Sequence, residues 1–301
     1  MAAPGPDGAV VEWSRADVAR LGELARLALP GEALLDDDLA SVCFDGTWPE
    51  ADGRSVVLAT ADGAGAVALT TRPGFSGTEA FVQLLAVHPD RRRAGIGQTL
   101  LAAADRWAAS CGAHRLRLAG AAPYYLWPGV DTLWVGAAAF ARASGFTVDG
   151  EAQNMALPAG ARAPTPDGVA IRHVLDDGDA EAVRVLVRSQ WPHWLAELDR
   201  GIEHGCCVGA FDGDGAPGAA ALGFCCHSVN RFGWLGPVGT DPEAQGRGIG
   251  GALVGAVCRD LQVAGLRSVE VCWIGPEAFY ASLGGVRSRT FTLLTRPVGE
   301  R

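Results

Sequence analysis

The pattern of hydrophobic and polar positions repeats along the 301 residues of the chain. An apolar run typical of a strand lies at 79–90, another lies at 231–242, and each carries a proline at or near its end. A glycine-containing turn follows each run, and then an apolar pattern with helical spacing, at 95–110 and 248–264. Two segments with the same order of elements predict an internal repeat and therefore two similar domains.

The repeat extends in both directions from the glycine turn. Helical spacing at 14–29 and 177–191 predicts an opening helix for each half, followed by a strand hairpin. After the long helix, each half is predicted to continue with a short strand, a second helix and closing strands. The second helices are expected at 135–146 and 276–286.

The composition changes between the two copies. Residues 158–168 are rich in Pro, Gly and Ala, which is typical of a linker. We therefore predict an N-terminal domain at 1–157 and a C-terminal domain at 169–301. The strand-like segments 147–157 and 286–296 are expected to close the first and the second domain, respectively.

The glycine turns have the chemistry of an anion site. A strand that leads directly into a helix leaves the first helical N–H groups without partners, and the positive helix end favours phosphate. Glycine lets a ligand approach the backbone there. Arg91, Arg92 and Arg93 add positive charge at the first turn, and Arg247 does so at the second. A tight turn without a ligand explains either copy equally well when it is taken alone.

The order strand, Pro-x-x-Gln/Arg-x-x-Gly-x-Gly and helix resembles the signature of the GCN5-related N-acetyltransferases, the GNAT family. Arg92–Gly97 and Gln245–Gly250 both meet it, and the resemblance covers essentially the whole chain as two tandem copies. It implies an α/β (α+β) fold with two GNAT-like domains. Each domain would have a mixed, mostly antiparallel sheet, a splayed central strand pair and flanking helices.

In this family the turn holds the pyrophosphate of acetyl-CoA, and the strand before it pairs with the pantetheine arm. The resemblance therefore implies acetyl-CoA as cosubstrate and no metal. The contacts implied in the first half come from Leu85, Ala86, Val87, Arg92, Arg93, Ala94, Gly95, Ile96 and Gly97. Those implied in the second half come from Val238, Gly239, Thr240, Gln245, Gly246, Arg247, Gly248, Ile249 and Gly250.

Acetyl transfer to an amine requires a base for the amine proton and an acid for the departing thiolate. The family often places a tyrosine in the late helix, in a Phe-Tyr-x-x-Leu-Gly-Phe pattern, and "FYASLGG" has Tyr280 at that position. The first half has Ala141 there, so we predict Tyr280 as the acid and a degenerate first half. A ring packed in the core also explains Tyr280.

Two residues are candidate bases. Glu270 alternates with Val269 and Val271, so it faces the other side of its strand, toward either the cleft or solvent. His193 lies between two tryptophans in the segment expected to roof the acceptor pocket, where packing is the competing interpretation.

The segment "AAPYYLWPGVD" at 121–131 has no counterpart in the second half. We favour a packing role, because aromatic rings bury large areas. A site roof and a homodimer interface remain open. Tyr124 and Tyr125 are substitute acids if the first half is active.

Composition narrows the function further. The net charge of −9 argues against nonspecific nucleic-acid binding and suits a cationic substrate. All 25 basic residues are arginines, which excludes a lysine Schiff base. Eight cysteines without a C-x-x-C motif favour buried, reduced thiols and no metal. The sequence shows neither a signal peptide nor a membrane-length apolar run, so we expect a cytoplasmic protein without a membrane partner.

These features predict an acetyl-CoA-dependent N-acetyltransferase that acts on a small amine by direct attack in a ternary complex. The C-terminal half is expected to be catalytic. One alternative is a CoA-binding regulatory protein without turnover. Another is an acyltransferase that uses a longer acyl-CoA or a hydroxyl acceptor. The sequence carries no motif that identifies the acceptor.

Overall fold

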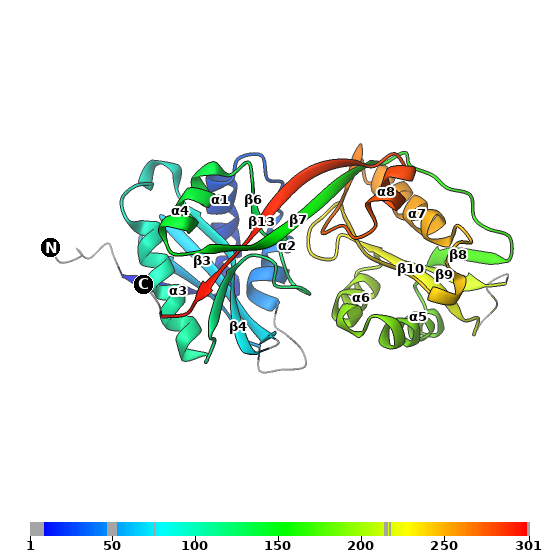
Figure 1. Ribbon diagram of the computed structural model, residues 1–301, viewed down its shortest axis with the longest axis horizontal. Coiled ribbons are helices and arrows are strands. Elements are labelled where there is room, and N and C mark those ends of the chain that lie inside the picture. Colours follow the sequence, from blue (N-terminus) through cyan, green and yellow to red (C-terminus); the bar gives the residue numbers. More distant parts are fainter. Residues whose placement is uncertain (1–8, 47–52, 75, 214–215, 217, 300–301) are drawn as a thin grey trace. The chain divides into compact units, whose positions relative to one another are not determined.

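The computed structural model describes residues 9–46, 53–74, 76–213, 216 and 218–299. The chain forms two compact units. Unit 1 comprises Met1–Ala152 and Thr290–Arg301, and unit 2 comprises Gln153–Arg289. Each unit is a mixed sheet with helices on its faces (Figure 1), which confirms the predicted fold class.

Unit 1 is built around a sheet whose strands β1 to β4 are antiparallel neighbours, followed by a parallel β4–β5 pair. Its strands are β1 (Val10–Trp13), β2 (Ser55–Thr60), β3 (Gly65–Gly74), β4 (Gly77–Val87), β5 (Arg115–Leu118), β6 (Val130–Asp131) and parts of β7 (Thr147–Pro158) and β13 (Val286–Pro297). Its helices are η2 (Arg15–Asp17), α1 (Val18–Ala28), α2 (Asp36–Leu39), η3 (Ala40–Asp45), η4 (Pro89–Arg91), α3 (Ile96–Ser110) and α4 (Val135–Ala143).

Unit 2 repeats this order. Strands β8 to β11 are antiparallel neighbours, and β11 and β12 form a parallel pair. Its strands are β8 (Val169–His173), β9 (Cys207–Asp212), β10 (Ala221–His227), β11 (Trp234–Thr240), β12 (Ser268–Val271) and the remaining parts of β7 and β13. Its helices are α5 (Asp177–Gln190), η5 (Pro192–Trp194), α6 (Leu195–Glu203), η6 (Pro242–Ala244), α7 (Ile249–Val263) and α8 (Glu277–Ser282).

The long strands β7 and β13 each have one part in each unit (Figure 1). In unit 1, residues 294–297 of β13 pair with β5, and in unit 2, residues 155–158 of β7 pair with β12. Each sheet is therefore completed by a strand from the other half of the sequence. This division differs from the predicted boundaries at 1–157 and 169–301, because an apolar pattern identifies a strand but not the sheet that it joins.

The segment 158–168, which we predicted to be a linker, packs against α7 instead. A Cβ atom on Gly255 would lie 3.1 Å from the main-chain nitrogen of Ala163, and one on Gly251 would lie 3.1 Å from the Cβ of the same alanine. Ala159 and Ala161 are buried. Small residues on the segment and on α7 allow the two backbones to approach closely. Gly251 and Gly255, which have no glycine counterparts in α3, allow this close packing.

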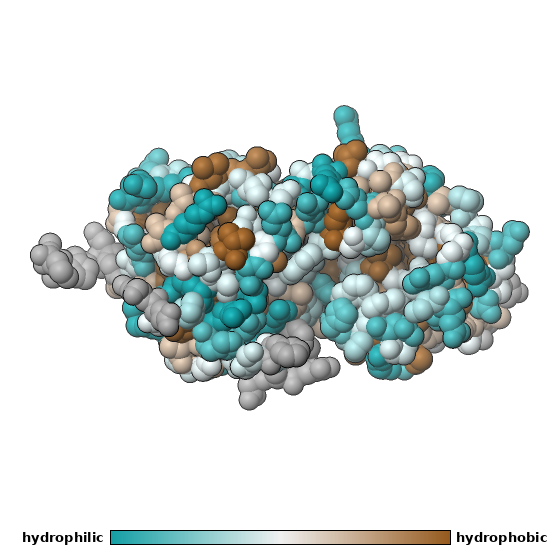
Figure 2. All heavy atoms as spheres, viewed as in Figure 1, coloured by the Kyte–Doolittle hydropathy of each residue, from teal (hydrophilic) through white to brown (hydrophobic). Residues whose placement is uncertain are grey.

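Within the described ranges, no helix is both long and apolar enough to cross a bilayer. Polar and weakly polar side chains cover most of the face seen in Figure 2, and apolar side chains occur there in separate patches. Five of the eight cysteines are buried, which agrees with the predicted burial of most of them.

The exchange of β13 can be tested at Arg296. Its guanidinium donates to both oxygens of Asp105 on α3 at 2.7 Å, and the two side chains are only 4% and 15% exposed. Arg296→Met leaves a largely covered carboxylate without this partner, and breaking a fully buried pair costs up to about 3–5 kcal/mol. We expect denaturant unfolding at a clearly lower midpoint, together with faster amide hydrogen exchange in α3.

Arg287→Met is the matched control on the same strand. Arg287 pairs with Glu277 at 2.6 Å, but the two side chains are 60% and 43% exposed, and such surface pairs contribute less than about 1 kcal/mol. Equal effects of the two variants would contradict the insertion of β13 into unit 1.

Candidate active site

The two glycine turns have the same backbone conformation. After η4, Arg93 has φ +64° and Gly95 has φ +83°. After η6, the equivalent residues Gly246 and Gly248 have φ +78° and +86°. Gly95 and Gly248 are the left-handed N-caps of α3 and α7. A residue with a side chain is strained in this conformation, which accounts for the glycines at three of the four positions.

Both helices begin without a side-chain cap. The first intrahelical bonds are donated by Thr99 to Gly95 and by Ala252 to Gly248, so the preceding N–H groups of each helix lack intrahelical acceptors. A Cβ on Gly95 would meet nothing within 4 Å, and one on Gly248 would meet only Pro166 at 3.7 Å. Open space in front of uncapped N–H groups fits a phosphate or pyrophosphate group at both turns.

The Arg or Gln side chain at the start of each turn donates hydrogen bonds to main-chain carbonyls of the preceding strand. Gln245 donates through Nε2 to the carbonyl of Thr240 at 3.4 Å. Arg92 donates through Nε to the carbonyl of Val87, also at 3.4 Å, and through Nη2 to the carbonyl of Ala28 at 2.6 Å. Both side chains therefore hold the end of the preceding strand against the turn. Their expected contacts with acetyl-CoA stay a prediction.

The second glycine of each turn packs against the late helix. A Cβ on Gly97 would lie 3.3 Å from the ring of Phe140 on α4, and one on Gly250 would lie 3.4 Å from the ring of Phe279 on α8. The two phenylalanines are thus structurally equivalent. The residues after them, Ala141 and Tyr280, occupy equivalent positions too, as we inferred from the sequence.

The central parallel strand pair separates in both units. The β4–β5 register ends at Val82, and β4 continues to Val87 paired with β3 on its other edge. The β11–β12 register contains only Trp234 and Leu235, and β11 continues to Thr240. The residues predicted to line the pantetheine arm, 85–87 and 238–240, lie on these separate stretches. A strand with one unpaired edge can accept an extended amide chain as a neighbour.

Tyr280 lies beside the open stretch of unit 2. It is 4% exposed and belongs to the core on the α7 side of the sheet. Burial raises the pKa of its phenol, and the nearby thiols of Cys225 and Cys272 add to this shift. Cys225 is the register partner of Val238 on β11, and Cys272 directly follows β12. In the part of the chain that the structure describes, no hydrogen bond engages the Tyr280 hydroxyl.

Glu270 lies on the opposite face of β12. Its neighbours Val269 and Val271 are buried in the core of the α7 side, and Glu270 itself is half-buried. Asn154 of β7 donates through Nδ2 to Oε1 of Glu270 at 2.5 Å, and its Oδ1 accepts the main-chain N–H of Trp273 at 2.9 Å. Sequence reasoning missed Asn154, because nothing in the pattern links β7 to β12.

His193 belongs to η5, and its side chain is exposed. Its ring packs on Trp194 with the centroids 5.1 Å apart. Among the described residues, no hydrogen bond joins His193 to Glu270 or Tyr280. Trp191 lies closer to the strand, because a Cβ on Gly239 would be 2.6 Å from its ring. Trp191, and not His193, is therefore the side chain that packs over β11.

A buried polar network connects α6 to the β10–β11 hairpin. Asn230 donates to Glu197 at 3.3 Å, and Arg200 donates to Asn230 at 2.6 Å. Burial raises the pKa of Glu197 to about 7, although Arg200 and Asn230 oppose this shift. Glu197 is only 5% exposed, although a glutamate on a helix usually faces solvent.

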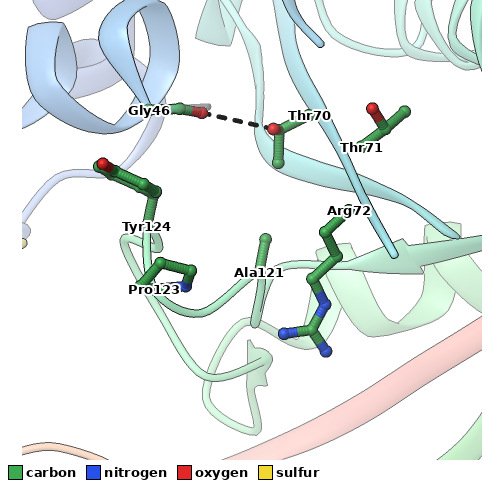
Figure 3. Close-up of a pocket in the computed structure, with 7 residues that line it drawn as sticks. All are labelled: Gly46, Thr70, Thr71, Arg72, Ala121, Pro123 and Tyr124. Carbon is green, nitrogen blue, oxygen red and sulfur yellow. Dashed lines mark hydrogen bonds between the residues drawn. The ribbon is translucent and has the colours of Figure 1, made fainter. Parts of the chain in front are cut away.

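The aromatic segment 121–131 of unit 1 is largely buried in the core of the unit. Tyr125 and Trp127 are 6% and 2% exposed, which supports the packing interpretation. Arg72 donates to the carbonyl of Ala122 at 2.8 Å, and Gln83 donates to the carbonyl of Tyr124. Figure 3 shows a small pocket beside this segment, with Arg72 pointing toward it; the lining residues are Gly46, Thr70, Thr71, Arg72, Ala121, Pro123 and Tyr124.

The fold and the paired turns define a tandem acyltransferase class of protein, and comparison with known proteins gives the family. The model of the acetyltransferase (GNAT) family matches residues 23–125 and 177–284, which is more than half of the chain. The chain therefore belongs to the GNAT family. A sequence comparison with curated proteins gives no match.

Solved structures share the whole tandem fold at low identity. A tandem GNAT protein from the clavulanic acid biosynthesis pathway is 21% identical, with 97% of this chain and 99% of that chain covered and a TM-score of 0.74. A glucosamine N-acetyltransferase region of a fungal multi-domain β-N-acetylglucosaminidase is 18% identical, with a TM-score of 0.73. That match covers 96% of this chain but only 38% of the fungal one. A GNAT protein from Sphaerobacter thermophilus is 17% identical, with 96% and 95% covered and a TM-score of 0.62.

The raised pKa of Glu197 predicts a pH-dependent stability. A carboxyl with a folded pKa of about 7 and an unfolded pKa near 4.5 destabilises the fold as pH rises between these values. Glu197→Gln removes the ionisable group. We expect the stability of this variant, relative to wild type, to rise by up to about 3 kcal/mol from pH 4.5 to pH 8. Urea unfolding at four pH values measures this difference; a constant difference would contradict the buried carboxyl.

Proposed function

We propose that unit 2 transfers an acetyl group from acetyl-CoA to a small primary amine within a ternary complex. The observation that carries this proposal is the position of Tyr280 beside the open end of β11, directly after the aromatic residue that packs on the glycine turn. A turn that fits a pyrophosphate, an open strand edge and a protonated phenol meet only in this unit among the described residues. The net charge of −9 favours a cationic acceptor.

The donor is positioned by the backbone. The N–H groups at the start of α7 hold the pyrophosphate, and the free edge of β11 from Val238 to Thr240 pairs with the pantetheine amides. This places the thioester where β11 and β12 separate. Holding the donor and acceptor together supplies much of the rate enhancement, because the reaction itself needs little covalent assistance.

Two side chains move the protons. The amine nitrogen attacks the thioester carbon, a C–N bond forms, and the C–S bond breaks. Glu270 accepts the proton that the amine loses, and Tyr280 donates one to the leaving thiolate. We prefer Glu270 over His193 as the base, because Glu270 flanks the open strand pair whereas His193 packs on Trp194 at the surface. The raised pKa keeps the phenol of Tyr280 protonated throughout the working pH range.

Unit 1 would bind acetyl-CoA without transferring its acetyl group. Its turn has the same conformation and the same open space, but Ala141 replaces the acid. Tyr125 is buried in the aromatic segment and offers no evident replacement. The fungal relative's region is named for glucosamine acetylation, so an amine acceptor is compatible with this tandem fold.

The donor site can be tested at one equivalent position in each unit. Arg247 and Ala94 are exposed and lie directly before the left-handed glycines. A carboxylate there repels a pyrophosphate without disturbing the core. We expect Arg247→Glu to weaken acetyl-CoA binding to unit 2 at least tenfold by calorimetry, about 1.4 kcal/mol, and to lower transfer in parallel.

Ala94→Glu is the matched variant in unit 1. We expect it to remove a second binding event and to leave the transfer rate unchanged. If Ala94→Glu abolishes transfer while Arg247→Glu does not, the catalytic unit is unit 1 and the assignment is wrong.

The acid is tested by Tyr280→Phe, which removes only a hydroxyl. We expect kcat to fall about 10²–10⁴-fold with little change in the KM for acetyl-CoA. The thermal unfolding midpoint should stay within about 1 °C, since the described structure gives the hydroxyl no hydrogen-bond partner. Tyr124→Phe in unit 1 serves as the control and should leave kcat unchanged. Full activity of Tyr280→Phe would exclude this residue as the acid.

A further inference from the structure

Asn154 is the most completely buried polar side chain near the open strand pair of unit 2. Its exposed fraction is 0%, and it lies on β7, ahead of the segment 158–168 and of every other strand of unit 2. The register of β7 on β12 places Met155 opposite Val271 and Ala156 opposite Glu270. The exchanged strand therefore brings this amide to the point where β12 leaves β11.

The orientation of the amide follows from its partners. The main-chain N–H of Trp273 can only donate, so the atom that receives it at 2.9 Å is the oxygen Oδ1. The other atom, 2.5 Å from Oε1 of Glu270, is then the nitrogen Nδ2, which can only donate. Both hydrogen bonds are satisfied in one orientation, and the flipped amide would satisfy neither.

The two bonds fix both sides of the candidate site. Oδ1 holds the main chain at Trp273, which has φ +49° and is the second residue beyond the end of β12, where the strand pair is open. Nδ2 holds Oε1 of Glu270 and so restricts the rotation of the carboxylate. No described residue donates a hydrogen bond to Oε2, so this oxygen is available to an acceptor amine.

The surroundings of Glu270 contain few other charges. Its register partner on β11 is Trp234, and the guanidinium of Arg231 lies 4.5 Å from the centre of that tryptophan ring. From β7 the facing polar group is the amide of Asn154 itself. No ion pair to Glu270 occurs among the described residues. A change at Asn154 therefore acts on the carboxylate without a nearby ion pair to compensate.

We propose that Asn154 is a positioning residue of the unit 2 active site, which aims the carboxylate of Glu270 at the acceptor amine. This inference rests on the proposed acetyl transfer with Glu270 as base. It also means that a residue from the strand closing the N-terminal half of the sequence completes the site of the C-terminal unit.

Asn154→Asp tests the proposal in the full chain. It replaces the donor by a second carboxylate beside Glu270, and the repulsion between two adjacent carboxylates favours the form in which they hold one proton between them. We expect acetyl transfer on the acidic limb of the pH profile to fall at least tenfold and to recover as the pH rises. The acidic limb of the kcat/KM profile should move upward by about one pH unit or more. The KM for acetyl-CoA should change little.

Asn230→Asp is the matched control. Asn230 is the other buried asparagine of unit 2, is 7% exposed, and donates to a buried glutamate, Glu197. It should lose stability as Asn154→Asp does but keep the acidic limb of wild type. Equal losses for both variants at every pH would show that Asn154 only supports the fold.

Carbon-13 labelling of the glutamate carboxyls gives a readout that does not depend on transfer. The Glu270 resonance, assigned with Glu270→Gln, should titrate at higher pH in Asn154→Asp than in wild type. If it titrates identically, the hydrogen bond is not formed in solution and the inference falls. If the resonance shifts as expected but no amine is acetylated, the contact stands and the proposed function fails.

Discussion

The left-handed backbone at Gly95 and Gly248 is the constraint on which each unit depends. A strand must end, reverse direction and begin a helix within a few residues, and this geometry requires positive φ directly before the first helical turn. The same conformation turns the uncapped N–H groups outward, so the folding constraint and the anion site are one feature. The glycine two residues later serves packing instead, since it admits the aromatic ring of the late helix.

Part of this arrangement could be predicted from the sequence. The strand, the turn and the helix are local, so their residue spacing is visible in the printed chain, and the equivalence of Ala141 and Tyr280 followed from it. The conformation of Arg93 was not visible, because arginine rarely adopts φ +64° and its glycine counterpart, Gly246, appears only in the other copy. The predicted contacts of both turns with acetyl-CoA remain predictions.

The rest of the site depends on distant pairing, which local patterns do not encode. The segment 158–168 has the composition of a linker, yet small residues on both it and α7 allow close contact. Glu197 looks like a solvated helix position, but the hairpin residue Asn230 and the core cover it. Asn154 gives no signal because its partners, Glu270 and Trp273, lie more than 100 positions away. Glu197 and Asn154 were recognised as parts of the site from their burial and hydrogen bonds in the structure, because their residue types alone do not indicate such a role.

The strand exchange gives each half of the sequence a structural role in the other unit. If each half of the sequence formed its own complete sheet, the two halves would be separable at the composition boundary. They are not, because β12 takes its neighbour from residues 155–158 and unit 1 takes Arg296 from the last strand. Deleting either half removes a strand from the sheet of the other. The first half of the sequence therefore supplies a strand of the second sheet and the amide beside Glu270, whether or not it binds acetyl-CoA.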